Sequence, residues 1–490
     1  MRAKLLDLLR SLRSTYWFVP GCMAVAAVAA SILTLWLDVE IGERWVSEHF
    51  WMYSNQPDGA RAVLATVAGS MITVAGVTFS MTIASVSYAA GQLGPRLMTN
   101  FMRDRGNQYT LGTFIATFLY SLMILRTVRD GSEEGADFDV ASFVPQVSVL
   151  CSLGLAVAST AVLIYFIHHV PESINAQNIT ARIGRDLVKA VDEQFPGRVG
   201  TGPAEGATGD PPCSNPDRDR LPAGFGEQAR AVAAASSGYV RSVDHENLMD
   251  LAEEEGLVVR LLVRPGDFVA SGQELMRVWP PERFDGQKEA EADRAGSSSE
   301  HQRAGDLLGE LAGRGDLVTR CRGLLSLGAE KTHHQNLLFL VDELVEIAAR
   351  AVSPGINDPF TAITAIDWLR SGLSALGERD PLSAHRFDGE GVLRVVAEPA
   401  SFEEALSSAC AQLRPYVAAD RNAALRLLET LGQLALRAED PGRRSVILGE
   451  AEKLADATDA SLPLAIDRER IRTRLISLGL AAGSATGQRQ

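Results

Sequence analysis

Runs of basic residues are missing from this chain of 490 residues. It carries 47 Lys and Arg against 61 Asp and Glu, which gives a net charge of −14. Proteins that bind nucleic acid without sequence preference need clustered cationic side chains to displace counterions from the phosphates. The sequence therefore predicts no nucleic-acid partner.

Cysteine is scarce, and the usual metal-binding and catalytic motifs are missing. The five cysteines are far apart and form no CxxC pair, so we expect free thiols. His333 and His334 precede Asp342 and Glu346 but form no HExxH motif. A P-loop, a GxSxG motif and a dinucleotide-binding glycine motif are also absent from the sequence. We expect neither an enzyme nor a protein that carries a metal or another cofactor.

Charged residues are rare in four long apolar stretches, which cover residues 16–37, 60–90, 109–125 and 144–167. About 20 apolar residues in a helix cross the hydrocarbon core of a bilayer, because the helix satisfies its backbone amides internally. The first stretch could also be read as a cleavable signal peptide, but it is too long and lacks a clear cleavage motif. The sequence thus predicts an α-helical polytopic membrane protein, with a transmembrane domain over residues 1–170 that has the lipid bilayer as its partner.

The charges between these stretches predict the orientation in the membrane. The N-terminal tail and residues 91–108 are basic, whereas residues 38–59 and 126–143 are acidic overall. Basic loops stay in the cytoplasm, so both termini are predicted to be cytoplasmic. We expect a multi-pass protein of the bacterial inner (plasma) membrane.

The second stretch is longer than a bilayer requires, and one of its faces is small and hydroxylated. The hydroxyl residues are Thr66, Ser70, Thr73, Ser80 and Ser87. Small residues let helix backbones approach closely, so this face can be a packing surface. Alternatively, its hydroxyl groups can replace water around a solute in a pore at the axis of a homo-oligomer.

Two polar groups are predicted at the inner membrane surface. Three arginines belong to an amphipathic elbow after the second stretch: Arg96, Arg103 and Arg105. This elbow suits an anionic leaflet, or a gate that senses tension or lipid. Three further residues follow the fourth stretch at helical spacing: His168, His169 and Glu172. They are either two interfacial histidines beside a carboxylate or a pH-responsive or metal-binding cluster.

The remaining chain is predicted to form a cytoplasmic α+β region, whose parts differ in composition. Residues 196–227 contain 13 Gly and Pro, which excludes a packed helix or strand. The predicted parts are a connecting amphipathic helix (171–195), a flexible loop (196–227), a small β module (228–281), a disordered insertion (282–306), a mainly helical C-terminal domain (307–480) and a disordered tail (481–490).

The β module resembles a biotinyl/lipoyl-like half-barrel. A Gly-x-Val strand at residues 238–240 is followed by a Pro-Gly-Asp-x-Val turn at residues 265–269. Carrier domains of that type present a lysine on an exposed hairpin, but residues 238–278 contain no lysine. We therefore expect a structural or ligand-recognition module.

The helical domain is predicted to contain a sharp corner at residues 353–359. Helices are expected over about 302–327, 334–352, 359–376, 402–413, 420–438, 442–457 and 463–479. At the corner, Asn357 and Asp358 precede Pro359, which suits the first position of a helix. Asn357 and Asp358 either cap this corner or bind a ligand.

Four separated motifs resemble one bacterial membrane-protein family. They are Tyr88-Ala-Ala-Gly-Gln-Leu-Gly-Pro-Arg96, Asn100-Phe-Met-Arg-Asp-Arg-Gly-Asn-Gln108, Ile167-His-His-Val-Pro-Glu-Ser173 and Ser353-Pro-Gly-Ile-Asn-Asp-Pro-Phe-Thr-Ala362. In this order they are similar to the family catalogued as domain of unknown function 2254, over roughly residues 10–440. The resemblance implies an inner-membrane protein and brings no activity, substrate or catalytic residues.

Two functions follow from these patterns. The first is a homo-oligomeric channel for an ion or small solute, with the second stretch nearest the axis and the cytoplasmic half as a gating or sensing domain. The alternative is a membrane-anchored sensor or scaffold that binds a cytoplasmic partner without transport. An enzyme would need a polar cluster that the sequence does not show.

Overall fold

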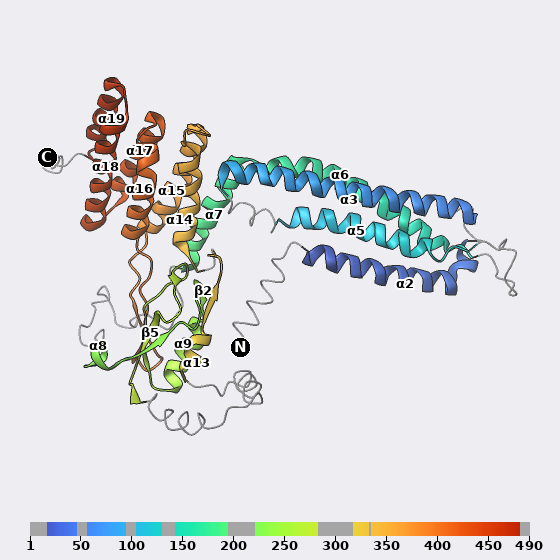
Figure 1. The fold of residues 1–490 in the computed structure, drawn as a ribbon, viewed down its shortest axis with the longest axis horizontal. Helices are drawn as coiled ribbons and strands as arrows, with labels where there is room; N and C mark the ends of the chain where they lie inside the picture. Colours follow the sequence, from blue (N-terminus) through green and yellow to red (C-terminus); the bar gives the residue numbers. More distant parts are fainter. Residues whose placement is uncertain are drawn as a thin grey trace. The chain divides into compact units, whose positions relative to one another are not determined.

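The computed structural model describes residues 17–46, 56–94, 104–129, 143–194, 221–282, 317–332 and 335–480. These residues belong to two compact units. The first, called the bundle unit below, ends at Ile179, and the second, called the C-terminal unit, runs from Thr180 onward. Figure 1 shows the long helices of the first, and the strands and shorter helices of the second.

The bundle unit consists of four long helices. They are α2 (Phe18–Val46), α3 (Pro57–Leu93), α5 (Arg105–Leu125) and α6 (Gln146–Ile174). Each is long and apolar enough to span a membrane, which confirms the four predicted stretches. Helix α5 begins four residues earlier than predicted, because Asp104 caps its N-terminus by accepting a hydrogen bond from the Gly106 amide at 2.8 Å.

Helix α5 packs against each of the other three helices, and half of its membrane span is buried. Buried hydroxyl groups join it to α6: Thr117 hydrogen-bonds Ser159 at 2.9 Å, and Ser121 hydrogen-bonds Ser152 at 2.8 Å. At the end near residue 38, the buried Asp38 carboxylate accepts hydrogen bonds from the backbone amides of Val147 and Ser148. A side chain of α2 therefore caps the first turn of α6.

In the segment 171–195, where a connecting helix was predicted, the structure has α7 (Ala176–Gln194). Helix α6 continues through Pro171 to Ile174, so the break lies at Asn175 rather than at the proline. The apolar face of α7 is buried at Ile183, Leu187 and Val191. Within the C-terminal unit this helix lies tightly against α15 (Pro359–Gly377), where a Cβ on Gly372 would stand 2.1 Å from a methyl carbon of Leu187.

Two small sheets form the β part of the C-terminal unit. The strands are β1 (Arg230–Ala233), β2 (Gly238–Val243), β3 (Val258–Leu261), β4 (Phe268–Val269), β5 (Glu274–Trp279), β6 (Leu325–Gly328), β7 (His385–Phe387) and β8 (Leu393–Val396). One sheet has the order β1-β5-β3-β8-β7 and the other has the order β4-β2-β6. Only the β3–β8 pair is parallel among the described strands.

The sheets do not coincide with the predicted β module over residues 228–281. Strands β6, β7 and β8 come from the domain that was expected to be mainly helical: β6 pairs with β2, β8 pairs with β3, and β7 pairs with β8. Helix α9 (His245–Glu254), which was not predicted, lies between β2 and β3. The biotinyl/lipoyl-like half-barrel is therefore not confirmed, because both sheets need strands from beyond residue 281.

Helices follow in the remainder of the unit. They are α13 (Leu317–Gly323), α14 (Leu337–Ala351), α15, α16 (Phe402–Val417), α17 (Arg421–Arg437), α18 (Pro441–Ser461) and α19 (Ala465–Ser477). The helix expected over 302–327 is wrong at its end, because β6 begins at Leu325. Residues 195–220, 283–316 and 481–490 of the predicted loop, insertion, helical domain and tail lie outside the described residues. The last part of the predicted loop is structured: α8 (Phe225–Gln228) buries Phe225 against Val258 and Phe387.

Candidate functional site

The hydroxyl face of α3 is turned away from the other helices of its bundle. All five predicted residues are exposed in the single chain: Thr66, Ser70, Thr73, Ser80 and Ser87. The opposite face packs inside the bundle through Leu64, Ala68 and Ala75. These five residues thus face outward, whereas Thr78 and Thr82 of the same helix are buried.

Two of these hydroxyl groups are satisfied by their own helix. Thr66 donates to the carbonyl of Ala62 at 2.7 Å, and Thr73 donates to the carbonyl of Gly69 at 2.8 Å. Their oxygen atoms keep free lone pairs as acceptors. Gly69 and Gly76 on the same side have open space where a Cβ would stand. This part of α3 therefore has glycines without side chains beside hydroxyl oxygens that can accept hydrogen bonds.

The predicted cluster after the fourth stretch separates into two pairs. His168 approaches Glu172 at 3.4 Å, and both side chains are exposed. His169 instead contacts Asp104 at the start of α5, with 2.8 Å between Nε2 and Oδ2, and it stacks on Tyr165. The predicted group is thus divided into a His168–Glu172 pair and a His169–Asp104 pair. The described residues include no group of three or more metal-binding side chains.

A buried amide lies next to this α5–α6 contact. Asn107 is 1% exposed, and neither its oxygen nor its nitrogen has a hydrogen-bond partner among the described residues. Gly106 lies against His169, since a Cβ there would stand 2.6 Å from Nε2. The end of the bundle near residue 105 therefore combines a carboxylate, an imidazole and an unpaired amide. The spacing of residues in the sequence did not predict this combination.

The elbow and the helix corner contribute less to a site. Arg96 and Arg103 lie outside the described residues, and Arg105 is exposed at the first position of α5. At the corner, Asp358 is the N-cap of α15 and accepts hydrogen bonds from the amide and hydroxyl of Thr361. Asn357 adopts a left-handed backbone with φ 52°. The capping interpretation accounts for the Asp358 carboxylate without a ligand.

The C-terminal unit contains a cavity of about 850 Å³. Its walls are the end of α7, the β3–β4 loop, the start of α14, β7, and the segment that leads from β8 into α16. Volumes of this size accommodate metabolite-sized ligands. The Pro-Gly-Asp turn at residues 265–267, which was predicted from sequence, forms part of this wall.

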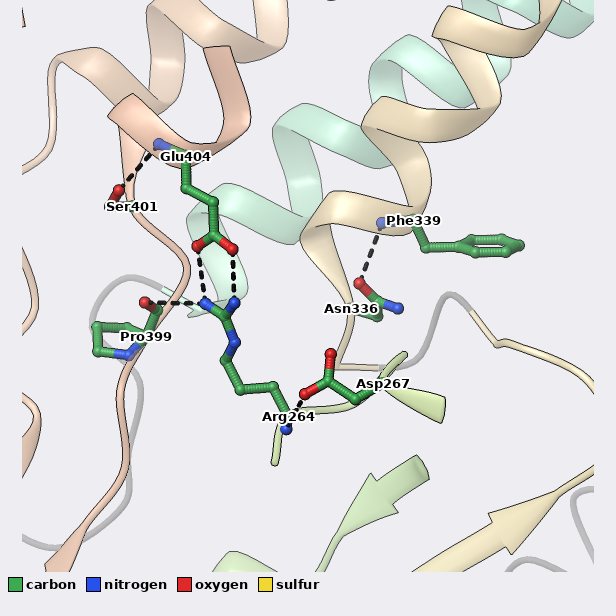
Figure 2. A network of polar contacts seen from close by, with 7 residues as sticks. All are labelled: Arg264, Asp267, Asn336, Phe339, Pro399, Ser401 and Glu404. Carbon is green, nitrogen blue, oxygen red and sulfur yellow. Dashed lines mark hydrogen bonds and ion pairs between the residues drawn. The ribbon is translucent and has the colours of Figure 1, made fainter. Parts of the chain in front are cut away.

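One side of the cavity is fixed by an arginine–carboxylate pair, shown in Figure 2. Arg264 donates two parallel hydrogen bonds to Glu404, with distances of 2.7 and 2.5 Å. This pair lowers the pKa of Glu404, chiefly through the hydrogen bonds from the guanidinium. Asp267 holds the backbone of the same loop by accepting from the Arg264 amide at 2.7 Å. The loop is therefore joined to α16 by a satisfied bidentate ion pair.

Another part of the cavity wall contains an arginine in a different situation. Arg386 on β7 is 8% exposed and donates to the backbone carbonyls of Ser383 and His385. Burial lowers its pKa, and no carboxylate among the described residues pairs with it. His245, the first residue of α9, also lines the cavity, and its buried Nδ1 has no hydrogen-bond partner among the described residues.

Comparison with known sequences shows where the chain belongs. The model of the family described as "Predicted membrane protein (DUF2254)" matches residues 13–433. The chain belongs to this family. Uncharacterized proteins of Mycobacterium bovis and Mycobacterium tuberculosis are each 31% identical to it over 421 residues, covering 84% of this chain and 72% of theirs. No solved structure matches the DUF2254 chain.

Sequence reasoning missed several polar residues of this DUF2254 protein. Asp104 could have been found, because Asp is a favoured N-cap residue and lies five residues before the apolar stretch that begins at residue 109. Asp244 likewise precedes α9 and accepts from the Asn247 amide. In contrast, nothing local in the sequence distinguishes Arg386 from the other arginines, because its β7–β8 hairpin joins the sheet through pairing of β8 with the distant strand β3.

Proposed function

We propose that this DUF2254 protein is a homo-oligomeric channel of the bacterial inner membrane, in which α3 of several copies surrounds the axis. The supporting observation is that all five hydroxyl residues of α3 are exposed on the surface of the single chain. Small and hydroxylated residues are characteristic of contacts between membrane helices and of polar pathways.

The outer surfaces of α2 and α6 support this assignment by contrast. Large apolar side chains are exposed there, including Ile32 and Leu33 on α2 and Val157 and Ile164 on α6. Such side chains are compatible with lipid tails. The α3 surface also exposes large apolar side chains, but glycine, serine and threonine are interspersed among them; these apolar residues are Val63, Ile72, Val77, Met81, Ile83 and Tyr88. We therefore assign α2 and α6 to lipid and α3 to neighbouring copies.

The chemistry of the α3 face limits the transported species. No charged side chain follows Arg61 within α3. Thr66 and Thr73 donate their hydrogens to their own helix, so their oxygens face outward as acceptors. The proposed solute is consequently a cation or a small polar molecule with hydrogen-bond donors.

The proposal places both termini and the C-terminal unit in the cytoplasm, in agreement with the distribution of basic residues between the apolar stretches. Helix α7 connects the two units covalently and packs against α15 within the C-terminal unit. A change in the C-terminal unit can thus reach α6 through a continuous stretch of chain. This unit is the proposed gating or sensing domain, and no enzymatic step is proposed for it.

Release of a small cation from liposomes that contain the purified protein tests the channel. Thr73→Leu places a bulky apolar group on the proposed axis and is expected to reduce flux several-fold, while the protein remains folded. Thr160→Leu is the matched control, because Thr160 is also exposed and also donates to a carbonyl four residues earlier, but lies on α6. Flux that is absent from the wild type under any voltage, tension or pH refutes the channel.

A second function, a membrane-anchored sensor, is favoured by a separate observation. The cavity of about 850 Å³ in the C-terminal unit is large enough for a small ligand. If α3 only packs against other helices, Thr73→Leu is expected to change the oligomeric state or stability instead of flux. Size-exclusion chromatography with light scattering on the same two variants separates this outcome from the first.

A further inference from the structure

Arg386 is a buried cation whose charge the described part of the chain leaves unbalanced. Its guanidinium is 8% exposed and donates only to two backbone carbonyls, those of Ser383 and His385. Carbonyl oxygens carry partial charges and cannot neutralise a full positive charge. Burial without a carboxylate lowers the pKa of Arg386, which reflects the cost of holding this cation away from water.

The neighbouring arginines of the same cavity are in the opposite situation. Arg264 is paired with Glu404 in a bidentate contact, and Arg260 lies 3.8 Å from Glu398. On the strand that pairs with β7, Arg394 contacts Asp388 at 2.8 Å. Arg386 therefore stands out among four neighbouring arginines, because each of the other three has a carboxylate within ion-pair distance.

A second polar group that lines the same cavity as Arg386 also lacks a partner among the described residues. Nδ1 of His245 is buried and makes no hydrogen bond among the described residues. The pKa of His245 is lowered first by burial and then by the positive charge of Arg386, although Asp244 opposes this shift. Both side chains line the same cavity, so one ligand there can meet the imidazole and the guanidinium together.

The geometry points to an oxyanion site. We propose that the cavity of the C-terminal unit binds a small molecule through a phosphate or carboxylate group, held by the guanidinium of Arg386 and by Nδ1 of His245. A planar guanidinium matches the oxygens of either group and strengthens the hydrogen bonds by its charge. This inference does not depend on α3 lining a pore.

The remaining walls define the rest of the ligand. Five carboxylates line the same cavity: Glu193, Asp267, Asp342, Glu398 and Glu404. Glu398 and Glu404 are paired with arginines, so it is the other three carboxylates, Glu193, Asp267 and Asp342, that would repel a ligand with several negative charges. The proposed ligand therefore carries one oxyanion group, and the rest of it is neutral or cationic.

Isothermal titration calorimetry on the purified full-length protein in phosphatidylcholine nanodiscs tests the site. The probes are inorganic phosphate and acetate at constant ionic strength, and a third arm follows thermal unfolding in nanodiscs that contain phosphatidic acid. Binding of phosphate or acetate would show that the site takes a soluble ligand with a phosphate or carboxylate group. Stabilisation seen only with phosphatidic acid assigns the oxyanion to a lipid headgroup.

Arg386→Gln is expected to weaken the observed binding at least tenfold. Because it removes an uncompensated buried charge, the variant should unfold at a temperature no lower than that of the unliganded wild type. Arg437→Gln is the matched control, since it removes a positive charge from an exposed pair with Glu378 and should bind like the wild type.

His245→Gln provides an independent variant if Arg386→Gln does not fold, and it is expected to weaken binding several-fold. The inference is overturned if none of the three probes acts on the wild type. It is equally overturned if the folded Arg386→Gln and His245→Gln variants respond as the wild type does, because the anion then binds elsewhere.

Discussion

Helices α3 and α5 of the bundle carry the same kinds of side chain in opposite surroundings. Two hydroxyl groups of α5 lie in the bundle interior and pair with hydroxyl groups of α6: Thr117 with Ser159, and Ser121 with Ser152. The hydroxyl face of α3 is exposed, and its Thr66 and Thr73 donate to their own helix, although Thr78 and Thr82 of the same helix are buried. The difference teaches that residue type alone does not assign a role to a membrane helix. The α5 hydroxyls stabilise one chain, whereas the α3 hydroxyls are available to something outside it.

The largest effect is expected where an interior polar group satisfies several partners. Asp38→Ala should lower the free energy of unfolding in detergent by about 4 kcal/mol, since it leaves two buried amides of α6 and the Ser148 hydroxyl without their acceptor. Asp38→Asn retains one acceptor oxygen and should lose clearly less. Equal unfolding midpoints for Asp38→Ala and the wild type would show that the interior contacts do not hold the bundle together.

Glycines give the same contrast between α5 and α3. A Cβ on Gly112 of α5 would stand 2.4 Å from the Met23 sulfur and 3.3 Å from the Pro20 Cα of α2. Gly112→Leu is therefore expected to cost about 3 kcal/mol through overpacking, measured by thermal unfolding in detergent.

Gly76→Leu on α3 is the matched substitution, because a Cβ there meets nothing within 4 Å. It should leave the stability of the single chain unchanged or slightly higher, while it weakens association between copies. The comparison fails if Gly76→Leu destabilises the detergent-solubilised monomer as much as Gly112→Leu does.

Much of this arrangement could be predicted from the sequence, and the reasons are physical. Four helices follow from the length of the apolar stretches, since only a helix satisfies the backbone in lipid. The capping role of Asp358 follows from a local rule for helix N-termini. The pairing of His169 with Asp104 joins residues 65 positions apart, and no local spacing specifies it. The short strands β7 and β8 were missed because a strand of three or four residues lacks a periodic pattern.

A smaller effect is expected from a single hydroxyl pair. Ser121→Ala removes the bond to Ser152 and should cost about 1 kcal/mol, a typical value for hydroxyl contacts between membrane helices. Thr73→Ala on α3 should change the stability of the monomer by less than about 0.5 kcal/mol. Unfolding in detergent at increasing denaturant concentration measures both. A larger loss for Thr73→Ala than for Ser121→Ala would reverse the comparison.

The smallest expected effect is a pH dependence of stability in the C-terminal unit. There the Glu404 carboxylate has an ion-pair partner, whereas the His245 imidazole has no hydrogen-bond partner at Nδ1 among the described residues. The pKa of His245 lies below 6.5 in the folded chain, because burial and then Arg386 disfavour the imidazolium, while Asp244 partly opposes them. Between this lowered pKa and pH 6.5 the unfolded chain binds more protons at this site than the folded chain does, so stability should fall as the pH falls.

Thermal unfolding of the full chain at pH values above and below 6.5 measures this dependence. His245→Gln should remove part of it and leave the dependence at lower pH that arises from carboxylates such as Glu404, whose pKa is lowered by Arg264. A pH profile that is identical in wild type and His245→Gln contradicts the buried, neutral state of this imidazole.

Reactivity of an engineered thiol on α3 tests the central claim most directly. Cys22, Cys151 and Cys213 are first replaced by alanine, whereas Cys321 and Cys410 are buried, and burial raises the pKa of Cys410 to about 12. Ser80→Cys and Thr160→Cys are then treated in intact membranes with a charged, membrane-impermeant thiol reagent. If α3 lines a water-filled axis, the cysteine at position 80 reacts quickly and the one at position 160 stays protected by lipid. Protection at both positions would contradict the channel.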